Sequence, residues 1–243
     1  MRVLGLDPSL TNFGWAVHDS DASGKARCPC RGRFQTSSKM LFIARYIEMR
    51  EQLAALIRET EPDAMALEFP VFNDLWSEGM YGLFLYSCEA LRSEGMDVVF
   101  LANNQIKGHA REFLGRPKVD GKVWKMMKPD MVEASKVDTG GGRWNHNEAD
   151  AYLCAKLGAR FWLFHNGDIA EADLTPVEHH QFAKIHKYGP RSKKAGEIVR
   201  RGIVYREDER FFMWSREAED DAKSKDNDKG GNQEEGSRQE EGG

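Results

Sequence analysis

The N-terminal stretch RVLGLDPSLTNFGWAV, residues 2–17, predicts two β-strands with a carboxylate at the end of the first. Apolar residues run up to Asp7 and stop at Pro8, and the letters FGWAV then alternate as in a second strand. A carboxylate at the end of a buried strand is costly to keep charged unless a cation meets it. Asp7 is therefore the first candidate functional residue.

Two further carboxylates lie in similar surroundings. The stretch DAMALEF (Asp63–Phe69) predicts a short buried strand that ends, like the first, on a carboxylate, Glu68. In the stretch HNEADAYLCAKLGARF, Asp150 falls on the apolar stripe of a helix packed against a sheet, where an aspartate is out of place. These two residues join Asp7 as candidates.

The acids near the start of that helix could instead have a structural role, because acidic residues stabilise the N-terminus of a helix. Asn147 as the N-cap residue would place Asp150 near the helix start, and Asn145 as the N-cap would do the same for Glu148. Neither alternative explains the strand-end carboxylate Glu68 or its counterpart Asp7.

Three carboxylates at two strand ends and on one helix predict a metal site. Like charges that close repel, so the cluster is stable only with bound cations. Oxygen ligands without thiolates suit Mg²⁺ or Mn²⁺. A pair of such ions about 4 Å apart activates a water and stabilises the leaving oxygen of a phosphodiester. Asp7, Glu68 and Asp150 are therefore the expected ligands of a two-metal site.

The remaining pattern predicts an α/β fold with a mixed sheet and helices on both faces. A three-stranded meander comes first, and helices then alternate with strands. The further elements expected are a strand at Arg31–Ser37, a helix at Ser38–Glu59, a helix at Ser77–Ser93, a strand at Met96–Ala102 and a helix at Glu148–Phe161.

The character of the chain changes after residue 164. Residues 165–216 predict a small, basic α+β extension, with a helix whose capping box is Thr175 and Glu178 and a hairpin over Gly202–Trp214. Residues 217–243 have no aromatic or branched aliphatic side chain, so we expect a disordered acidic tail.

Composition favours a soluble cytoplasmic protein with a basic body. The net charge is −4, but residues 207–243 hold 13 acidic and 6 basic residues, so the rest of the chain is mildly basic. No apolar run approaches the roughly 18 residues of a membrane span, and no signal peptide is evident. Cys28 and Cys30 lack zinc-knuckle spacing, and His179, His180 and His186 have no cysteine nearby, so we expect no zinc site.

A family resemblance becomes visible at this point. The stretches LGLDPSLTNFGWAV, MALEFPVF and HNEADAYLCA resemble, in order and context, the three acidic motifs of the RuvC-like Holliday-junction resolvases of the RNase H and integrase superfamily. The likeness covers residues 1 to about 161. It implies a five-stranded mixed sheet flanked by helices over residues 1–164. It also implies a homodimer joined largely through the helix after Glu68, and paired symmetric nicks on a four-way DNA junction.

The resemblance also implies a DNA-binding surface. Lys107 and one of Lys118 or Lys122 would lie in its basic, substrate-facing part, and Phe69, Phe72 or Trp76 would meet an unstacked base. A solvated loop explains the lysines equally simply, and core packing explains the aromatic residues. In the extension we expect phosphate contacts from Arg191, Lys193, Lys194, Arg200 and Arg201.

The fourth ligand of the predicted site stays open. In many relatives the position three residues before the last aspartate is Asp or His, whereas this chain has Asn147. Helical geometry places His146 and Asn147 on the face of Asp150, and it points Glu148 away once the helix has begun. We favour His146 because it can carry a proton or bind a metal, with Glu148 second.

Other functions share some of these features. A flap, replication-fork or RNA:DNA hybrid nuclease would use the same metal site, and a non-catalytic junction-binding protein would use the same basic surface. An actin-like ATP-binding protein also follows a strand-end aspartate with a phosphate loop, but Ser9 stands where that loop needs glycine, so we expect no nucleotide cofactor. The compact body with an added module suggests a bacteriophage source.

Overall fold

The computed structural model describes residues 1–20, 26–69, 78–115, 118–119, 122–187 and 204–205. Several predicted features lie outside these ranges, namely Phe72, Trp76, the tail 217–243 and the extension residues Arg191, Lys193, Lys194, Arg200 and Arg201. For Lys118 and Lys122 only the backbone is described. In the described ranges no helix is both long and apolar enough to cross a membrane.

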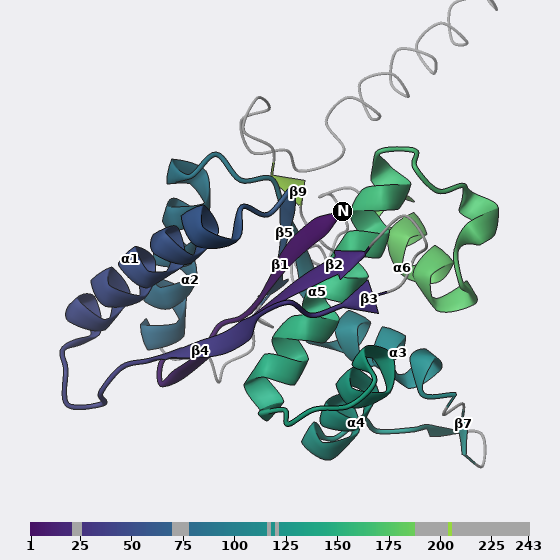
Figure 1. The fold of residues 1–243 in the computed structure, drawn as a ribbon, viewed down its shortest axis with the longest axis horizontal. Coiled ribbons are helices and arrows are strands. Elements are labelled where there is room, and N and C mark those ends of the chain that lie inside the picture. The colour runs from purple at the N-terminus through teal and green to yellow at the C-terminus, as the bar shows by residue number, and fades with distance from the viewer. Residues whose placement is uncertain (21–25, 70–77, 116–117, 120–121, 188–203, 206–243) are drawn as a thin grey trace, which may run out of the picture.

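A mixed sheet runs through the centre of the molecule, as predicted (Figure 1). β1, β2 and β4 form the antiparallel meander, and β5 and β6 continue it in parallel with β1. The short strand β3 also pairs with β2, because the third strand is interrupted at residues 28–30. The strands are β1 (Arg2–Asp7), β2 (Asn12–Ser20), β3 (Ala26–Arg27), β4 (Arg31–Gln35), β5 (Ala64–Phe69), β6 (Val98–Ala102) and β9 (Val204–Tyr205).

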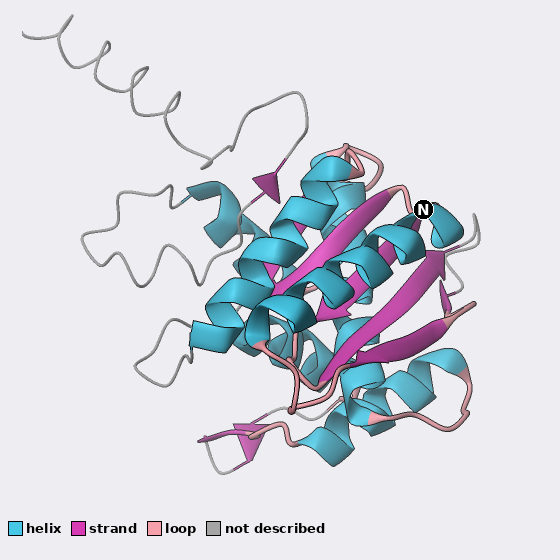
Figure 2. Cartoon of the chain, turned by 90° about the vertical axis from the view of Figure 1, so that its left-hand side faces the viewer, coloured by secondary structure: helices cyan, strands magenta, loops and turns pink. Residues whose placement is uncertain are grey.

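Helices cover both faces of the sheet (Figures 1 and 2). On one face lie α1 (Phe42–Thr60) and α2 (Glu78–Ser93), and on the other lies the long helix α5 (His146–His165). Three more helices pack beside α5, namely α3 (Asn103–Phe113), α4 (Lys128–Thr139) and α6 (Pro176–Lys187). The 3₁₀ helix η1 (Glu171–Asp173) precedes α6, and the strands β7 (Lys118–Val119) and β8 (Lys122–Val123) form a hairpin between α3 and α4.

Small residues let α5 lie unusually close to the sheet. A Cβ atom added at Gly5 would stand 2.1 Å from the Ala151 carbonyl oxygen, and one added at Gly158 would stand 2.4 Å from Ala66 Cβ. Real Cβ atoms are never that close, so both glycines are required by packing. The N-terminal half of α5 is thereby held against the ends of the central strands.

The predicted extension joins the same core through α6. Thr175 and Glu178 form the predicted capping box, with the Glu178 amide donating to Thr175 Oγ1 at 3.2 Å. Phe182 is fully buried and lies 5.6 Å from Phe161 between ring centroids. Beyond α6, Val204–Tyr205 pairs with β6, whereas the turn of the predicted hairpin lies outside the described residues. The domain boundaries stay predictions.

Candidate active site

Asp7 and Glu68 lie side by side at the ends of two parallel strands. β1 and β5 pair in register, with Leu6 opposite Leu67, so Asp7 and Glu68 occupy the next position of the ladder. Because side chains alternate along a strand, both acids share the face of Gly5 and Ala66, which is the face covered by α5.

Asp150 approaches from α5 and has no structural role there. The helix begins at His146, two residues before the predicted start, because Asn145 is its N-cap: Asn145 Oδ1 accepts from the Asn147 amide at 2.9 Å, and Glu148 completes the capping box. The structure therefore contains the capping pair Asn145 and Glu148, in which Asp150 takes no part. Asp150 Oδ1 is buried and has no hydrogen-bond partner among the described groups.

Burial raises the pKa of all three carboxylates. Burial, followed by the charges of Glu68 and Asp150, holds the pKa of Asp7 well above its usual range. Burial is also the largest cause for Glu68, whose pKa rises to about 7, and for Asp150, whose pKa rises to about 6. All three acids are still half-exposed, so a solvent ion or a substrate can reach them. The cluster is thus a place where bound cations would be strongly favoured.

Two neighbouring helices complete the surroundings of the acids. The side-chain amide of Asn103, at the start of α3, donates to Glu68 Oε1 at 2.6 Å and lowers the pKa of Glu68. The charges of Lys107 on α3 and Lys128 on α4 lower the pKa of Asp7. The structure thus places the predicted Lys107 beside the acids. Asn103 and Lys128 were not predicted, although Asn103 directly follows β6, the strand that pairs with β5.

The donor set fits a hard divalent cation. It consists of carboxylate oxygens, one of which is an orphaned buried atom, Asp150 Oδ1, and it contains no thiolate. Among the described residues, however, no three His, Cys, Asp or Glu side chains are already arranged to hold one ion. The metal site therefore stays a prediction.

The three candidates for a fourth ligand lie in different surroundings. Asn147 is buried and donates its side-chain amide to the Asn12 carbonyl oxygen at 2.6 Å. Glu148 accepts the cap bond and pairs with Arg31 at 3.4 Å. His146 is half-exposed, and besides partial burial, the charges of Lys128 and Arg33 lower its pKa. Its role as a ligand stays a prediction.

Comparison with known proteins gives matches to one kind of enzyme. The crossover junction endodeoxyribonuclease RuvC of Synechocystis sp. is 30% identical over 111 residues, which are 44% of this chain and 66% of the relative. The RuvC of Finegoldia magna is 36% identical over 73 residues, 30% of this chain and 44% of the relative. The matches therefore span less than two thirds of these relatives. No model of a protein family matches the chain.

Two solved structures share the fold. Thermus thermophilus RuvC superimposes with a TM-score of 0.55 at 19% identity, covering 69% of this chain and 97% of that one. T. thermophilus RuvC in complex with a Holliday junction substrate gives 0.52 at 18% identity, covering 64% and 90%. The fold is thus the RNase H-like fold that RuvC also has, as predicted. The resemblance to the RuvC-like resolvases, drawn from the three acidic motifs, is confirmed.

Proposed function

We propose that this chain is a metal-dependent endodeoxyribonuclease that resolves four-way DNA junctions. The observation that carries the proposal is the Asp150 carboxylate. Its buried Oδ1 has no hydrogen-bond partner among the described groups, it does not cap α5, and it lies close enough to Asp7 to act on its charge. The names of the RuvC relatives support the reaction and the substrate.

Asp7, Glu68 and Asp150 would hold Mg²⁺ or Mn²⁺, with His146 as the proposed fourth ligand. Two such ions supply an activated water and neutralise charge on the leaving oxygen of a phosphodiester. Carboxylates whose pKa values are raised chiefly by burial release their protons when a cation binds, so metal binding and ionisation are coupled at this site.

The chain's own residues would prepare the site for a phosphate. Asn103 fixes the orientation of the Glu68 carboxylate through its hydrogen bond. Lys107 and Lys128 stand close enough to act on the acids, so they provide positive charge for a phosphodiester that approaches the same edge of the sheet. Non-bridging phosphate oxygens would otherwise meet only acidic side chains.

A homodimer would supply two such sites for paired nicks. Nine large apolar side chains are strongly exposed among the described residues, and six lie on or beside α1 and α2: Leu41, Phe42, Ile43, Ile47, Tyr81 and Leu85. An apolar surface of this kind is typical of an interface. We propose that this surface, which includes the helix after Glu68, joins two copies of the chain.

A cleavage panel tests the function. Wild-type protein and Asp7→Asn are incubated with Mg²⁺ and, separately, a four-way junction, a flap, a replication fork, a linear duplex and an RNA:DNA hybrid. We expect the wild type to cut the junction in two symmetric positions, and Asp7→Asn to bind the junction without cutting it. Preferred cutting of the flap, fork or hybrid would overturn junction resolution, and wild-type-like cutting by Asp7→Asn would overturn the metal site.

A further inference from the structure

A groove runs along α4 and reaches His146, the first residue of α5. Its volume is about 620 Å³, and its walls are formed by one side of α4 and by the segment that enters α5. Lys128, Val132 and Lys136 recur every four residues on the α4 wall, so they form one stripe along the helix. Lys136 follows Lys128 by eight residues, a rise of about 12 Å along the helix, which matches three to four nucleotides of one DNA strand.

Lys128 connects the groove with two of the three carboxylates. Lys128 lines the groove and also acts electrostatically on Asp7 and Asp150. The Lys128 end of the groove is therefore the end nearer the carboxylates, and Lys136 lies two helical turns away from it. Glu133 is an acid on the same wall, whereas Arg33 of β4 adds positive charge near His146 on the other side.

On the opposite wall, Trp144 is already in contact with neighbouring side chains. The Arg31 guanidinium lies 3.9 Å above the Trp144 ring, and the Tyr152 ring lies 5.2 Å from it between centroids. The indole nitrogen of Trp144 donates to the Gly141 carbonyl oxygen at 3.2 Å. A strand in this groove would accordingly be held by its backbone and not by base stacking.

We propose that this groove binds the phosphodiester backbone of the cleaved strand just beyond the bond that is cut. The proposal rests on the proposed nuclease function and adds residues to it. Lys128 and Lys136 contact phosphates three to four nucleotides apart, and the contact is independent of base sequence because it reads charge alone. The groove thereby sets the direction in which the strand leaves the acidic cluster.

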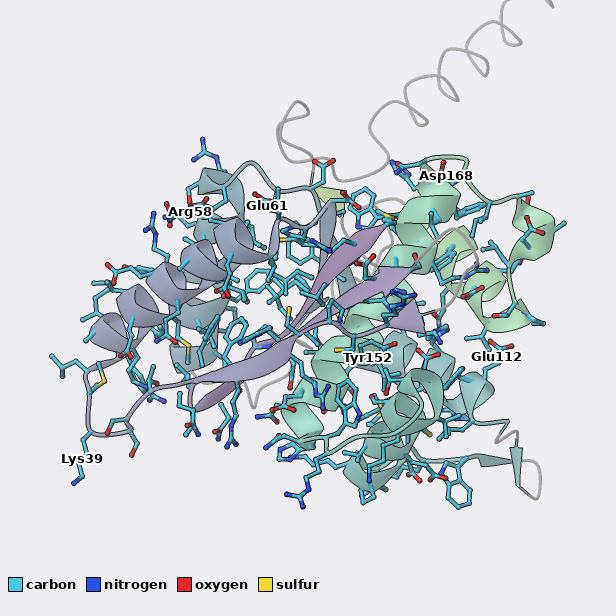
Figure 3. All side chains as sticks on the ribbon, viewed as in Figure 1. Lys39, Arg58, Glu61, Glu112, Tyr152 and Asp168 are labelled. Carbon is cyan, nitrogen blue, oxygen red and sulfur yellow. The ribbon has the colours of Figure 1, made fainter. Side chains whose placement is uncertain are left out.

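Lys136→Gln tests the groove more cleanly than a change at Lys128, because Lys128 also acts on the proposed metal ligands. Arg58→Gln is the matched control: Arg58 is an exposed cation that pairs with Glu94 at the far end of α1, well away from α4 in Figure 3. Both changes are made in the Asp7→Asn background, and binding of a four-way junction is measured by fluorescence anisotropy at several NaCl concentrations.

We expect Lys136→Gln to weaken junction binding several-fold near 0.1 M salt and to reduce the slope of log K against log salt by about 0.9. Arg58→Gln should change neither. Glu133→Gln should strengthen binding, since it removes an acid from the groove. Equal affinity and slope for Lys136→Gln and Arg58→Gln, with both variants melting like their parent, would overturn the proposal.

A second measurement locates the contact. Single neutral methylphosphonate linkages are placed one to four nucleotides on either side of the cleaved bond. One of them should weaken binding by the Asp7→Asn parent without weakening Lys136→Gln any further. If every linkage affects both proteins equally, the groove does not hold this strand. Cleavage by the wild-type protein is read separately, so loss of the nuclease function and loss of the groove contact give different results.

Discussion

Asn103 donates its side-chain amide to Glu68 Oε1 at 2.6 Å, and this bond fixes the orientation of one carboxylate in the acidic cluster of Asp7, Glu68 and Asp150. Asn103→Ala should reduce the cleavage rate by about 10-fold at neutral pH, because Glu68 loses both its orientation and a bond that lowers its pKa. The pH at which the rate rises should accordingly shift upward. Rates are measured under single-turnover conditions from pH 6 to 9.

Asn104 supplies the control for that experiment. It is the next residue on α3 and is exposed. Asn104→Ala therefore makes the same Asn-to-Ala change in the first turn of α3 but keeps the hydrogen bond from Asn103 to Glu68. We expect a wild-type rate and pH profile from Asn104→Ala. Should both alanine variants lose rate equally with no change in profile, Asn103 would act on the stability of α3 and not on Glu68.

Metal-free protein should lose stability as the pH rises. The pKa values of Glu68 and Asp150 in the folded chain, about 7 and about 6, lie above those of ordinary carboxylic acids. Stability from such groups is fully present below about pH 4 and is lost as pH rises through the folded values. Glu68→Gln cannot ionise, so it should be more stable than the wild type by about 1–3 kcal/mol at pH 8 and equal to it at pH 4.

Thermal melts in EDTA measure this difference, and melts with Mg²⁺ provide the complementary test. Mg²⁺ should raise the melting temperature of the wild type at pH 8 and should raise that of Glu68→Gln much less. Identical stability of the two proteins at every pH in EDTA would show that folding does not raise the pKa of Glu68.

The sheet and its acids could be predicted because their sequence signals are local. Asp7 and Glu68 each end a short apolar run, and Asp150 interrupts an apolar stripe, so the ends of elements could be located without knowing their neighbours. The mixed sheet with helices on both faces followed from the meander and the later helix–strand alternation.

The helices α3 and α4, in the basic region between β6 and α5, could not be predicted from the sequence because some of their buried residues are polar. The buried positions of α3 include Gln105 and His109, and those of α4 include Ser135, so burial there does not follow hydropathy. The contacts of Asn103 and Lys128 with the acids depend on how these two helices pack, which periodicity cannot provide. The split of the third strand at residues 28–30 depends likewise on pairing with β2.

Close packing of α5 should control the acidic cluster. Gly158→Ala would bring a Cβ atom to 2.4 Å from Ala66 Cβ, so the helix must move away from the sheet, at a cost of about 1–3 kcal/mol. Gly108→Ala, in α3, meets only the end of the Gln181 side chain and gains helix propensity. We expect a lower melting temperature and weaker Mg²⁺ binding for Gly158→Ala alone. Equal effects of both changes would contradict the packing argument.

Leu85 tests the proposed dimer. It is exposed on α2, so Leu85→Arg should leave the fold intact and convert a dimer into monomers by placing a charge on the apolar surface. Val137→Arg, an equally exposed position on α4, is the control and should remain dimeric. Sedimentation velocity distinguishes the states. A monomeric wild type, or a Leu85→Arg protein that stays dimeric, would remove this surface as the interface.

The last prediction concerns the fourth ligand. Glu148 accepts the cap bond from the Asn145 amide and pairs with Arg31, so Glu148→Ala should lower stability by about 1 kcal/mol and cost little in rate. His146 begins α5, four residues and about 40° of helix rotation before Asp150. It has neither of the Glu148 interactions, so its ring is available to a metal or a proton. His146→Ala should therefore cost orders of magnitude in cleavage rate at saturating Mg²⁺ with an unchanged melting temperature. Single-turnover rates and melts of both variants decide the matter, because the reverse ranking would mean that Glu148 leaves its cap and turns toward the acids when substrate binds.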